Sequence, residues 1–255
     1  MNGVPNTLIM MITTNIVYYS WRHEPSFIPY ESYFAPENIL RSVTEYNTEN
    51  TDSNFIKCPI FNTFARKTFN LLSPIDFNFE ICHNHVRSNH DTSKFFPENF
   101  VYVRNLELNC ISLNLLNYVF FTETPCTMTW NNSYFSKRQF SSKVHVIPGQ
   151  YNISRWFRNV DLAFIVRNKN DEVYIQRKEP VASVNFDFQN DDRIVFKRFE
   201  LNEKLCKYLN FRKIISYDTA QRPKFNKLLS YYYNLFDGSL AKKGIIKEIK
   251  RNILE

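Results

Sequence analysis

The stretch Val181-Ala182-Ser183-Val184-Asn185-Phe186-Asp187-Phe188 ends in alternating apolar and polar side chains, the pattern of a strand with one face in a core. Similar short apolar runs recur from Asn99 to Phe199, separated by Asn, Asp, Gly or Pro. This spacing predicts successive strands. We expect strands at Phe100–Val103, Leu106–Leu113, Tyr118–Phe121, Thr127–Trp130, Val144–Ile147, Ile153–Phe157, Leu162–Arg167, Glu172–Gln176, Val181–Phe188 and Ile194–Phe199.

A sheet with one face in solvent has to pack its other, apolar face against a second layer. Strands in this number therefore predict a mainly β fold, an antiparallel β-sandwich of the jelly-roll kind. Asn168-Lys169-Asn170-Asp171 contains residues that tolerate left-handed turn conformations, which predicts a hairpin over Leu162–Gln176. Pro148-Gly149 marks another turn.

Outside this region the patterns change. Leu8–Trp21 is apolar and predicts one or two buried strands. We expect a short helix at Pro36–Thr44 within a long loop, and a further strand at Ile75–Ile81. After Leu201 the apolar period lengthens toward 3.6, which indicates amphipathic helices. We therefore expect a β-sandwich unit over residues 1–200, with a long irregular N-terminal part, and a helical segment over residues 201–255. The apolar positions of these helices are Leu201, Leu205, Leu209, Phe225, Leu228, Leu229, Tyr232, Phe236, Ile245, Ile246, Ile249 and Ile253.

The composition is that of a globular protein, with 255 residues, 44% hydrophobic residues and 24 phenylalanines. Five cysteines without a CxxC pair argue against a disulfide framework and a zinc ribbon. No apolar run reaches the length that spans a membrane, so we expect a soluble, cytoplasmic protein without membrane contact. The net charge of +7 is a weak indication of an anionic partner or nucleic acid.

Three histidines gather in Cys82-His83-Asn84-His85-Val86-Arg87-Ser88-Asn89-His90-Asp91. On a strand, His83 and His85 point to the same face, and His90 returns to it after a turn. Three imidazoles, completed by Asp91 or the distant His145, would suit Fe²⁺ or Zn²⁺ in a cupin-type double-stranded β-helix. The more ordinary interpretation is a polar loop whose histidines bond to backbone and water.

A second candidate site is Arg155-Trp156-Phe157-Arg158, which places two cations beside an indole. Arg155, Trp156 and Arg158 would stack on a base or clamp a carboxylate or phosphate. The alternative is a strand whose Trp156 enters the core while both arginines point to solvent. The basic tail, with Lys242, Lys243, Lys247, Lys250 and Arg251, would either touch phosphates or complement its own helix dipole.

The run from Phe121 to Phe186 resembles a family of uncharacterised phage and bacterial proteins over about a quarter of the chain. Its motifs are Thr127-Met128-Thr129-Trp130, Trp156-Phe157-Arg158 and Val173–Phe186. In that pattern Lys178 stands where glycine is expected. Val173–Phe186 is also similar to the closing strands of trimeric dUTPase-like barrels, whose glycine-rich motifs and catalytic aspartate are not recognisable here. The resemblance therefore brings no residue role and no activity.

Only four glycines and abundant asparagine are typical of AT-rich genomes such as those of many phages. The sequence contains no phosphate loop, nucleophile elbow or dinucleotide fingerprint. We therefore expect a phage- or virus-type binding or assembly protein without enzymatic activity, in the cytoplasm of an infected bacterium, with a protein partner or a second copy. The alternative is an Fe- or Zn-dependent enzyme using the histidine cluster.

Overall fold

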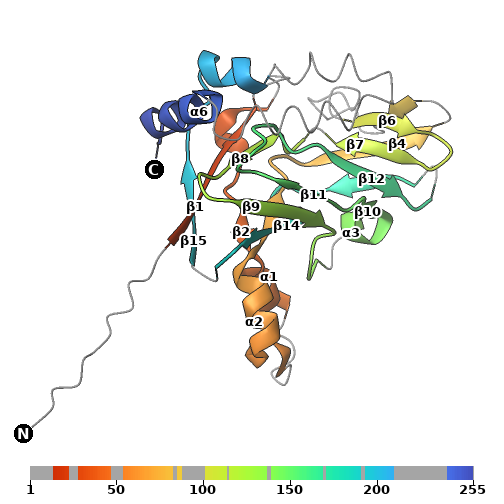
Figure 1. Cartoon of the computed structure of the whole chain (residues 1–255). Helices are drawn as coiled ribbons and strands as arrows, with labels where there is room; N and C mark the ends of the chain where they lie inside the picture. The colour runs from red at the N-terminus through yellow and green to blue at the C-terminus, as the bar shows by residue number, and fades with distance from the viewer. Residues whose placement is uncertain are drawn as a thin grey trace, which may run out of the picture.

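The computed structural model describes residues 14–22, 28–46, 54–82, 85–87, 101–113, 115–136, 139–168, 171–190, 193–209 and 240–254, and these residues contain four sheets. The mainly β prediction is confirmed, and none of the four sheets closes on itself among these residues (Figure 1). The first sheet has the order β15 (Arg193–Arg198), β1 (Thr14–Trp21) and β8 (Tyr118–Phe121), and the second has the order β10 (Val144–Val146), β12 (Leu162–Val166), β7 (Cys110–Leu113) and β6 (Val101–Asn105). The third, five-stranded sheet has the order β11 (Gly149–Asn152), β9 (Cys126–Asn131), β14 (Pro180–Phe188), β3 (Thr68–Leu72) and β2 (Glu37–Asn38). The fourth sheet has the order β13 (Val173–Ile175), β4 (Phe77–Cys82) and β5 (His85–Arg87).

The helices of the described residues are few and short. They are α1 (Ile39–Tyr46), α2 (Pro59–Arg66), α3 (Gln139–Lys143) and α6 (Leu240–Arg251), with 3₁₀ turns at Tyr30–Ser32 and Asn54–Lys57. Residues 203–209 are also helical. No helix of the described segments is long and apolar enough to cross a membrane.

Strand β14 occupies the centre of the five-stranded sheet, as its alternating sequence predicts. Val184 pairs with Trp130 of β9 on one side and with Phe69 of β3 on the other. Val184 and Phe186 are fully buried, whereas Asp187 is exposed. The predicted strands at 118–121, 127–130, 144–147, 162–167, 172–176, 181–188 and 194–199 all coincide with strands of the structure to within two residues at each end.

The predicted hairpin over Leu162–Gln176 is wrong. β12 pairs with β7 and β10, whereas β13 pairs with β4, where Val173 lies opposite Phe79. Turn-forming residues between two strands do not oblige those strands to pair. Val173 and Ile175 are fully buried, so partners far away in the sequence determine where β13 lies.

The strand expected at Leu106–Leu113 is partly a turn. Residues 106–109 form the tight turn between β6 and β7, with Asn109 at a φ of 48° and Leu108 N donating to Asn105 Oδ1 at 3.1 Å. An asparagine side chain that accepts a nearby backbone N–H competes with strand formation. The strand expected at 106–113 therefore begins at Cys110.

The pairing of β1 with β15 is parallel, a departure from the purely antiparallel expectation. Thr14 lies opposite Arg193, and Tyr19 lies opposite Arg198. β1 also pairs antiparallel with β8. The apolar N-terminal stretch is thus a buried strand from residue 14 onward, and residues 8–13 lie outside the described part of the chain.

Aromatic rings fill the main core between the sheets. Phe186 of β14 lies 5.4 Å from Phe120 of β8 and 5.6 Å from Phe196 of β15, in both cases edge to face. Full burial of each such side chain contributes about 1.5–3 kcal/mol. The core therefore joins the five-stranded sheet to the sheet of β1 and β8.

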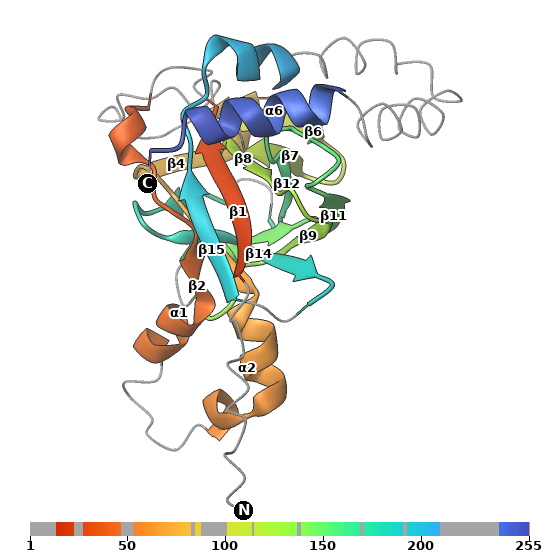
Figure 2. The same cartoon turned by 60° about the vertical axis from the view of Figure 1, so that its left-hand side comes forward.

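A second hydrophobic cluster lies between the sheet of β1 and the C-terminal helices. Ile245 and Ile249 of α6 are fully buried there, together with Phe121, Phe157 and Phe199. Figure 2 shows α6 across the ends of β1 and β15. The predicted apolar stripe of this helix is confirmed at Ile245 and Ile249. The predicted positions between residues 225 and 236 lie outside the described residues.

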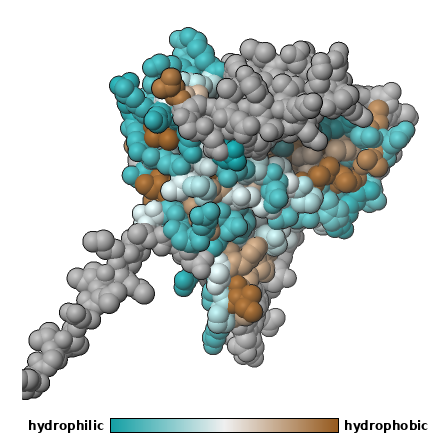
Figure 3. Space-filling model, viewed as in Figure 1, coloured by the Kyte–Doolittle hydropathy of each residue, from teal (hydrophilic) through white to brown (hydrophobic). Residues whose placement is uncertain are grey.

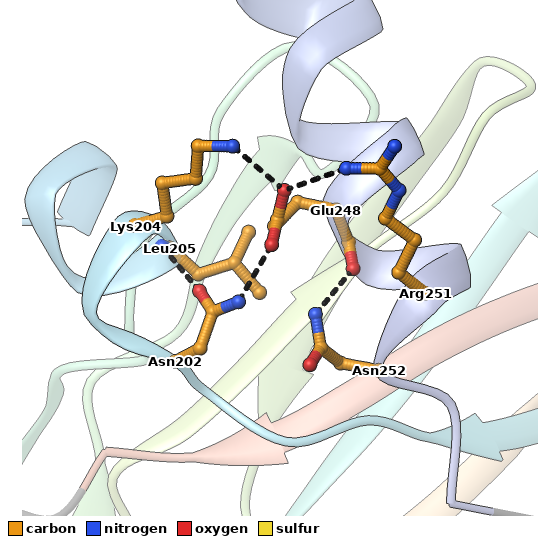
Figure 4. Close-up of polar contacts among 6 residues, drawn as sticks. All are labelled: Asn202, Lys204, Leu205, Glu248, Arg251 and Asn252. Atoms are coloured by element: carbon orange, nitrogen blue, oxygen red, sulfur yellow. Dashed lines mark hydrogen bonds and ion pairs between the residues drawn. The ribbon is translucent and has the colours of Figure 1, made fainter.

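Polar contacts hold α6 against the residues before it. Glu248 accepts a hydrogen bond from Asn202 Nδ2 at 2.7 Å and lies 3.2 Å from Lys204 Nζ (Figure 4). Asn202 also caps the helix at 203–209, because its Oδ1 accepts a hydrogen bond from Leu205 N. After α6, Ile253 forms an isolated bridge with Phe199.

Helices α1 and α2 project from the opposite end of the molecule in both views (Figures 1 and 2). The predicted helix at Pro36–Thr44 is confirmed as α1, shifted by two to three residues. A buried polar chain anchors it: Asn70 Nδ2 donates to Ser42 Oγ at 2.9 Å, and Ser183 Oγ donates to Asn70 Oδ1 at 2.6 Å. This chain satisfies polar groups inside the protein that would otherwise be costly to bury.

Candidate functional site

The first candidate site begins where β9 and β11 pair, with Gly149 opposite Trp130. A Cβ atom on Gly149 would lie 2.2 Å from Trp130 Cζ2, so the indole requires glycine at this position. Trp130 Nε1 donates a hydrogen bond to Ile147 O at 3.0 Å. The indole is therefore fixed against the backbone while remaining partly exposed.

The chain after β11 makes a turn stabilised by a side chain. Asn152 Oδ1 accepts hydrogen bonds from Ser154 N at 2.9 Å and from Ser154 Oγ at 2.7 Å. The strand expected at Ile153–Phe157 is therefore wrong: Ile153 to Arg155 form a turn, and no regular structure follows at Trp156 and Phe157. An asparagine that bonds its own backbone in this way favours a turn over a strand.

The turn brings Arg158 onto two aromatic rings. Its Cζ lies 4.8 Å from the ring centroid of Trp156 and 5.5 Å from that of Tyr151. Tyr151 in turn contacts Trp156 and Trp130 edge to face, with centroids 5.8 and 5.7 Å apart. Cation–ring contacts of this kind contribute about 0.5–2 kcal/mol, depending on exposure. We refer to Trp130, Tyr151, Trp156 and Arg158 as the arginine shelf.

Arg158 is partly buried, and its Nε donates to Asn159 O at 3.2 Å. No ion pair with a carboxylate is present at Arg158 among the described residues. The guanidinium is thus oriented by one hydrogen bond and two rings. Its remaining N–H groups form a planar fork suited to an oxyanion.

Of the three predicted residues, the structure brings together Trp156 and Arg158. Arg155 is partly buried, and its backbone N–H donates to Asn152 O at 3.3 Å. Trp156 packs against both hydrophobic clusters, so the expectation that it enters the core is also met in part. Sequence reasoning missed Trp130 and Tyr151. Gly149, one of only four glycines in the chain, could have indicated Trp130, because the two residues lie opposite each other in the pairing of β9 and β11.

The histidine cluster falls largely outside the described residues. His83, His90 and Asp91 are not described, and His85 begins β5, where it pairs with Cys82. His145 is exposed on β10, with its Nδ1 3.4 Å from Asn132 Nδ2. No group of three His, Cys, Asp or Glu side chains able to hold a metal occurs within the described segments. The metal site stays a prediction.

Next to that cluster, β4 and β5 hold a small polar group. Glu80 Oε1 lies 2.5 Å from Arg87 Nε and accepts a hydrogen bond from Cys82 Sγ at 2.7 Å. This hydrogen bond to a carboxylate is the main cause that raises the pKa of the Cys82 thiol. Since the thiolate is the nucleophilic form, a raised pKa argues against a reactive cysteine here.

A second candidate is an apolar surface on the outward side of the sheet β10–β12–β7–β6. In this sheet His145 lies opposite Ile165, and Tyr102 lies opposite Ser112. The exposed fractions are 48% for Tyr102, 37% for Ile165 and 37% for Ile147. Leu108, in the turn between β6 and β7, is 61% exposed. We refer to Tyr102, Leu108, Ile147 and Ile165 as the outer sheet face.

Apolar surface is visible on the side of the molecule where β10 and β12 lie (Figure 3). The outward side chains of the four strands include one basic residue, Arg104. Its Nη2 lies 2.6 Å from Asp161 Oδ2, and its Nε donates to Ser112 Oγ. The one basic side chain on these strands is therefore paired with a carboxylate.

Comparison with known proteins gives little further information. No protein-family model matches the chain, and no curated protein matches it. Among solved structures, a dUTPase of Staphylococcus bacteriophage 80alpha is similar at a TM-score of 0.33 and 10% identity, over 67% of this chain and 88% of that one. A likeness of this size decides neither family nor function.

Proposed function

We propose that this protein is a non-enzymatic binding or assembly protein of phage or viral type, which associates with a second copy of itself through the outer sheet face. In this proposal residues 1–200 form a jelly-roll-like β-sandwich, residues 201–255 form a helical segment, and the protein works in the cytoplasm of an infected bacterium. The observation that supports it is the exposure of Tyr102, Ile147 and Ile165 on one side of the sheet, with the exposed Leu108 in the adjoining turn. Apolar patches of this kind mark interaction sites.

Charge favours a second copy as the occupant of this face. The whole chain carries a net charge of +7, so most pairs of surfaces on two copies repel each other. On the outer sheet face, the ion pair of Arg104 with Asp161 removes the basic excess. Contact between two copies through this face would therefore be apolar and would not bring unpaired Arg104 charges together.

A competing apolar surface is the tip of α2, where Ile60 is 82% exposed and Phe64 is 38% exposed. Phe61 and Phe64 of α2 make edge-to-face contacts with Phe135 and Tyr134, respectively. Part of this apolar surface is thus covered by the chain itself. The outer sheet face has four exposed large apolar side chains against two on α2, so the proposal rests on it.

The solution mass tests this proposal. Light scattering of the purified full chain over a range of concentrations should give a multiple of the 30.6 kDa monomer mass. Ile165→Lys should return the mass to that of a monomer without lowering the thermal midpoint, because Ile165 is already exposed. Ile60→Lys is the matched control and should leave the assembly intact.

A strictly monomeric wild-type protein that captures no partner in pull-downs would contradict the proposal. A monomeric protein that captures a different protein, in a manner lost in Ile165→Lys, would keep the binding role and replace the second copy by that partner. No observation favours the metal-dependent enzyme, because the described residues provide no metal-binding group.

A further inference from the structure

We propose that the arginine shelf is a binding site for single-stranded nucleic acid, in which Arg158 takes a backbone phosphate and the partly exposed indoles of Trp156 and Trp130 take bases. This proposal does not depend on self-association, and the shelf adjoins the outer sheet face only at Ile147, whose carbonyl oxygen accepts the hydrogen bond of Trp130 Nε1.

The case for an anion begins with the state of the Arg158 guanidinium. It lies over two rings, at 4.8 and 5.5 Å from their centroids, and no carboxylate pairs with it among the described residues. Its Nε is engaged by Asn159 O, which leaves the edge with the two terminal nitrogens for a ligand. Planar, bidentate donation from this edge matches phosphate oxygens.

The rings beside Arg158 favour a nucleic acid over an acidic peptide. Two partly exposed indoles contact the buried ring of Tyr151, whose centroid is 5.8 Å from that of Trp156 and 5.7 Å from that of Trp130. A carboxylate needs only the guanidinium fork, whereas bases also use aromatic faces. Cationic grooves lined by aromatic side chains are how proteins bind single strands without sequence preference.

The shelf is held in place before any ligand arrives. Asn152 fixes the turn that delivers Trp156 and Arg158, and Gly149 with Ile147 O fixes the Trp130 indole. Binding therefore orders few additional side chains, which lowers its entropic cost. The net charge of +7 and the exposed Lys243 and Lys247 of α6 add a general attraction for phosphates.

The experiment titrates the full chain with oligothymidylate and follows both the anisotropy of a labelled strand and the intrinsic tryptophan fluorescence. Trp21 is only 2% exposed, so quenching reports on Trp130 and Trp156. We expect saturable binding with quenching. Arg158→Ala should weaken it by about tenfold or more and lower the slope of log K against log salt by about 0.7, the loss of one phosphate contact.

Arg66→Ala is the matched control, since Arg66 is an exposed arginine on α2, at the projecting end of the molecule. It should leave both the affinity and the quenching nearly unchanged. Arg158→Lys should keep the salt slope but lose part of the affinity, and Trp130→Phe should reduce the quenching. Far-ultraviolet circular dichroism of each variant confirms its fold.

Three outcomes would overturn the proposal. The first is that oligothymidylate does not bind, and the second is that Arg158→Ala and Arg66→Ala weaken its binding equally. The third is that polyglutamate binds as tightly as the oligonucleotide and depends on Arg158, which would indicate an acidic protein partner. A further titration uses thymidine monophosphate in place of the oligonucleotide. Quenching by the mononucleotide at the affinity of the oligomer would be a fourth such outcome, because it would assign the site to a free nucleotide.

Discussion

Lys178 occupies a backbone conformation that favours glycine, with a φ of 67°. It stands in the turn between β13 and β14, where its N–H donates to Ser73 O at 2.8 Å. The sequence resemblance placed a glycine at this position, and the structure supplies the physical reason. A side chain in this left-handed region costs about 1–2 kcal/mol.

Lys178→Gly should therefore stabilise the protein, by about 1 kcal/mol once the contact of Lys178 with the Phe34 ring at 5.4 Å is lost. Chemical denaturation measures the change in the free energy of unfolding. Arg177→Gly is the comparison: it adds backbone freedom at a residue without a positive φ and removes the hydrogen bond of Arg177 Nε to Pro74 O, so it should destabilise. Equal effects of the two substitutions would contradict the role assigned to the turn.

Gly149→Ala should destabilise the protein by about 1–3 kcal/mol, the usual cost of overpacking. The new Cβ would lie 2.2 Å from Trp130 Cζ2, so the indole has to move. Denaturation gives the energy, and tryptophan fluorescence reports the displaced ring. Gly244→Ala in α6 should instead be neutral or stabilising, because the new Cβ meets only the end of the Tyr208 side chain, with the hydroxyl at 3.0 Å, and alanine favours a helix interior.

At the scale of single elements, the Glu123 carboxylate links α6 to β1, because it contacts Lys250 of α6 and Tyr18 of β1. Glu123 Oε1 accepts a hydrogen bond from Tyr18 at 2.8 Å, and Lys250 Nζ lies 2.9 Å from it. Burial raises the pKa of Glu123, but the hydrogen bonds from Lys250 and Tyr18 outweigh it, so the pKa is lowered. A carboxylate with a lowered folded pKa stabilises the fold above its unfolded pKa and loses this contribution as the pH falls.

We therefore expect α6 to loosen as the pH falls below about 4.5, the ordinary value for a glutamate, and through the folded pKa of Glu123. Glu248 adds to this with the same sign, because hydrogen bonds from Asn202 and Lys204 lower its pKa. Amide hydrogen exchange of α6 at several pH values measures the effect. In Glu123→Gln the acid dependence should be weaker, and an unchanged dependence would refute this account.

Strand existence was predictable, whereas strand pairing was not. Tyr118–Phe121 coincides with its predicted strand because every residue of it is fully buried, which leaves a clear apolar signal. The error at Leu162–Gln176 arose because β13 has only three residues, and its partner β4 is about a hundred residues away. A local turn signal contains no information about such long-range packing.

For the whole molecule, the class of fold and the apolar stripe of α6 followed from periodicity. The two candidate surfaces did not. The arginine shelf joins Trp130 to Arg158 through a strand register, and the outer sheet face joins Tyr102 to Ile165 across three strands. Pattern along the chain shows which side chains face outward, but only the tertiary arrangement shows which of them are neighbours.

Hydroxyl-radical footprinting of the full chain tests the assembly claim most directly, because it reads the exposure of single side chains. The account predicts that Tyr102, Leu108 and Ile165 become protected as the concentration rises, while Ile60 on α2 stays reactive. The Ile165→Lys variant should show no such protection at any concentration. Protection that appears on Ile60, or reactivities that do not change with concentration, would contradict the assignment of the outer sheet face as the assembly surface.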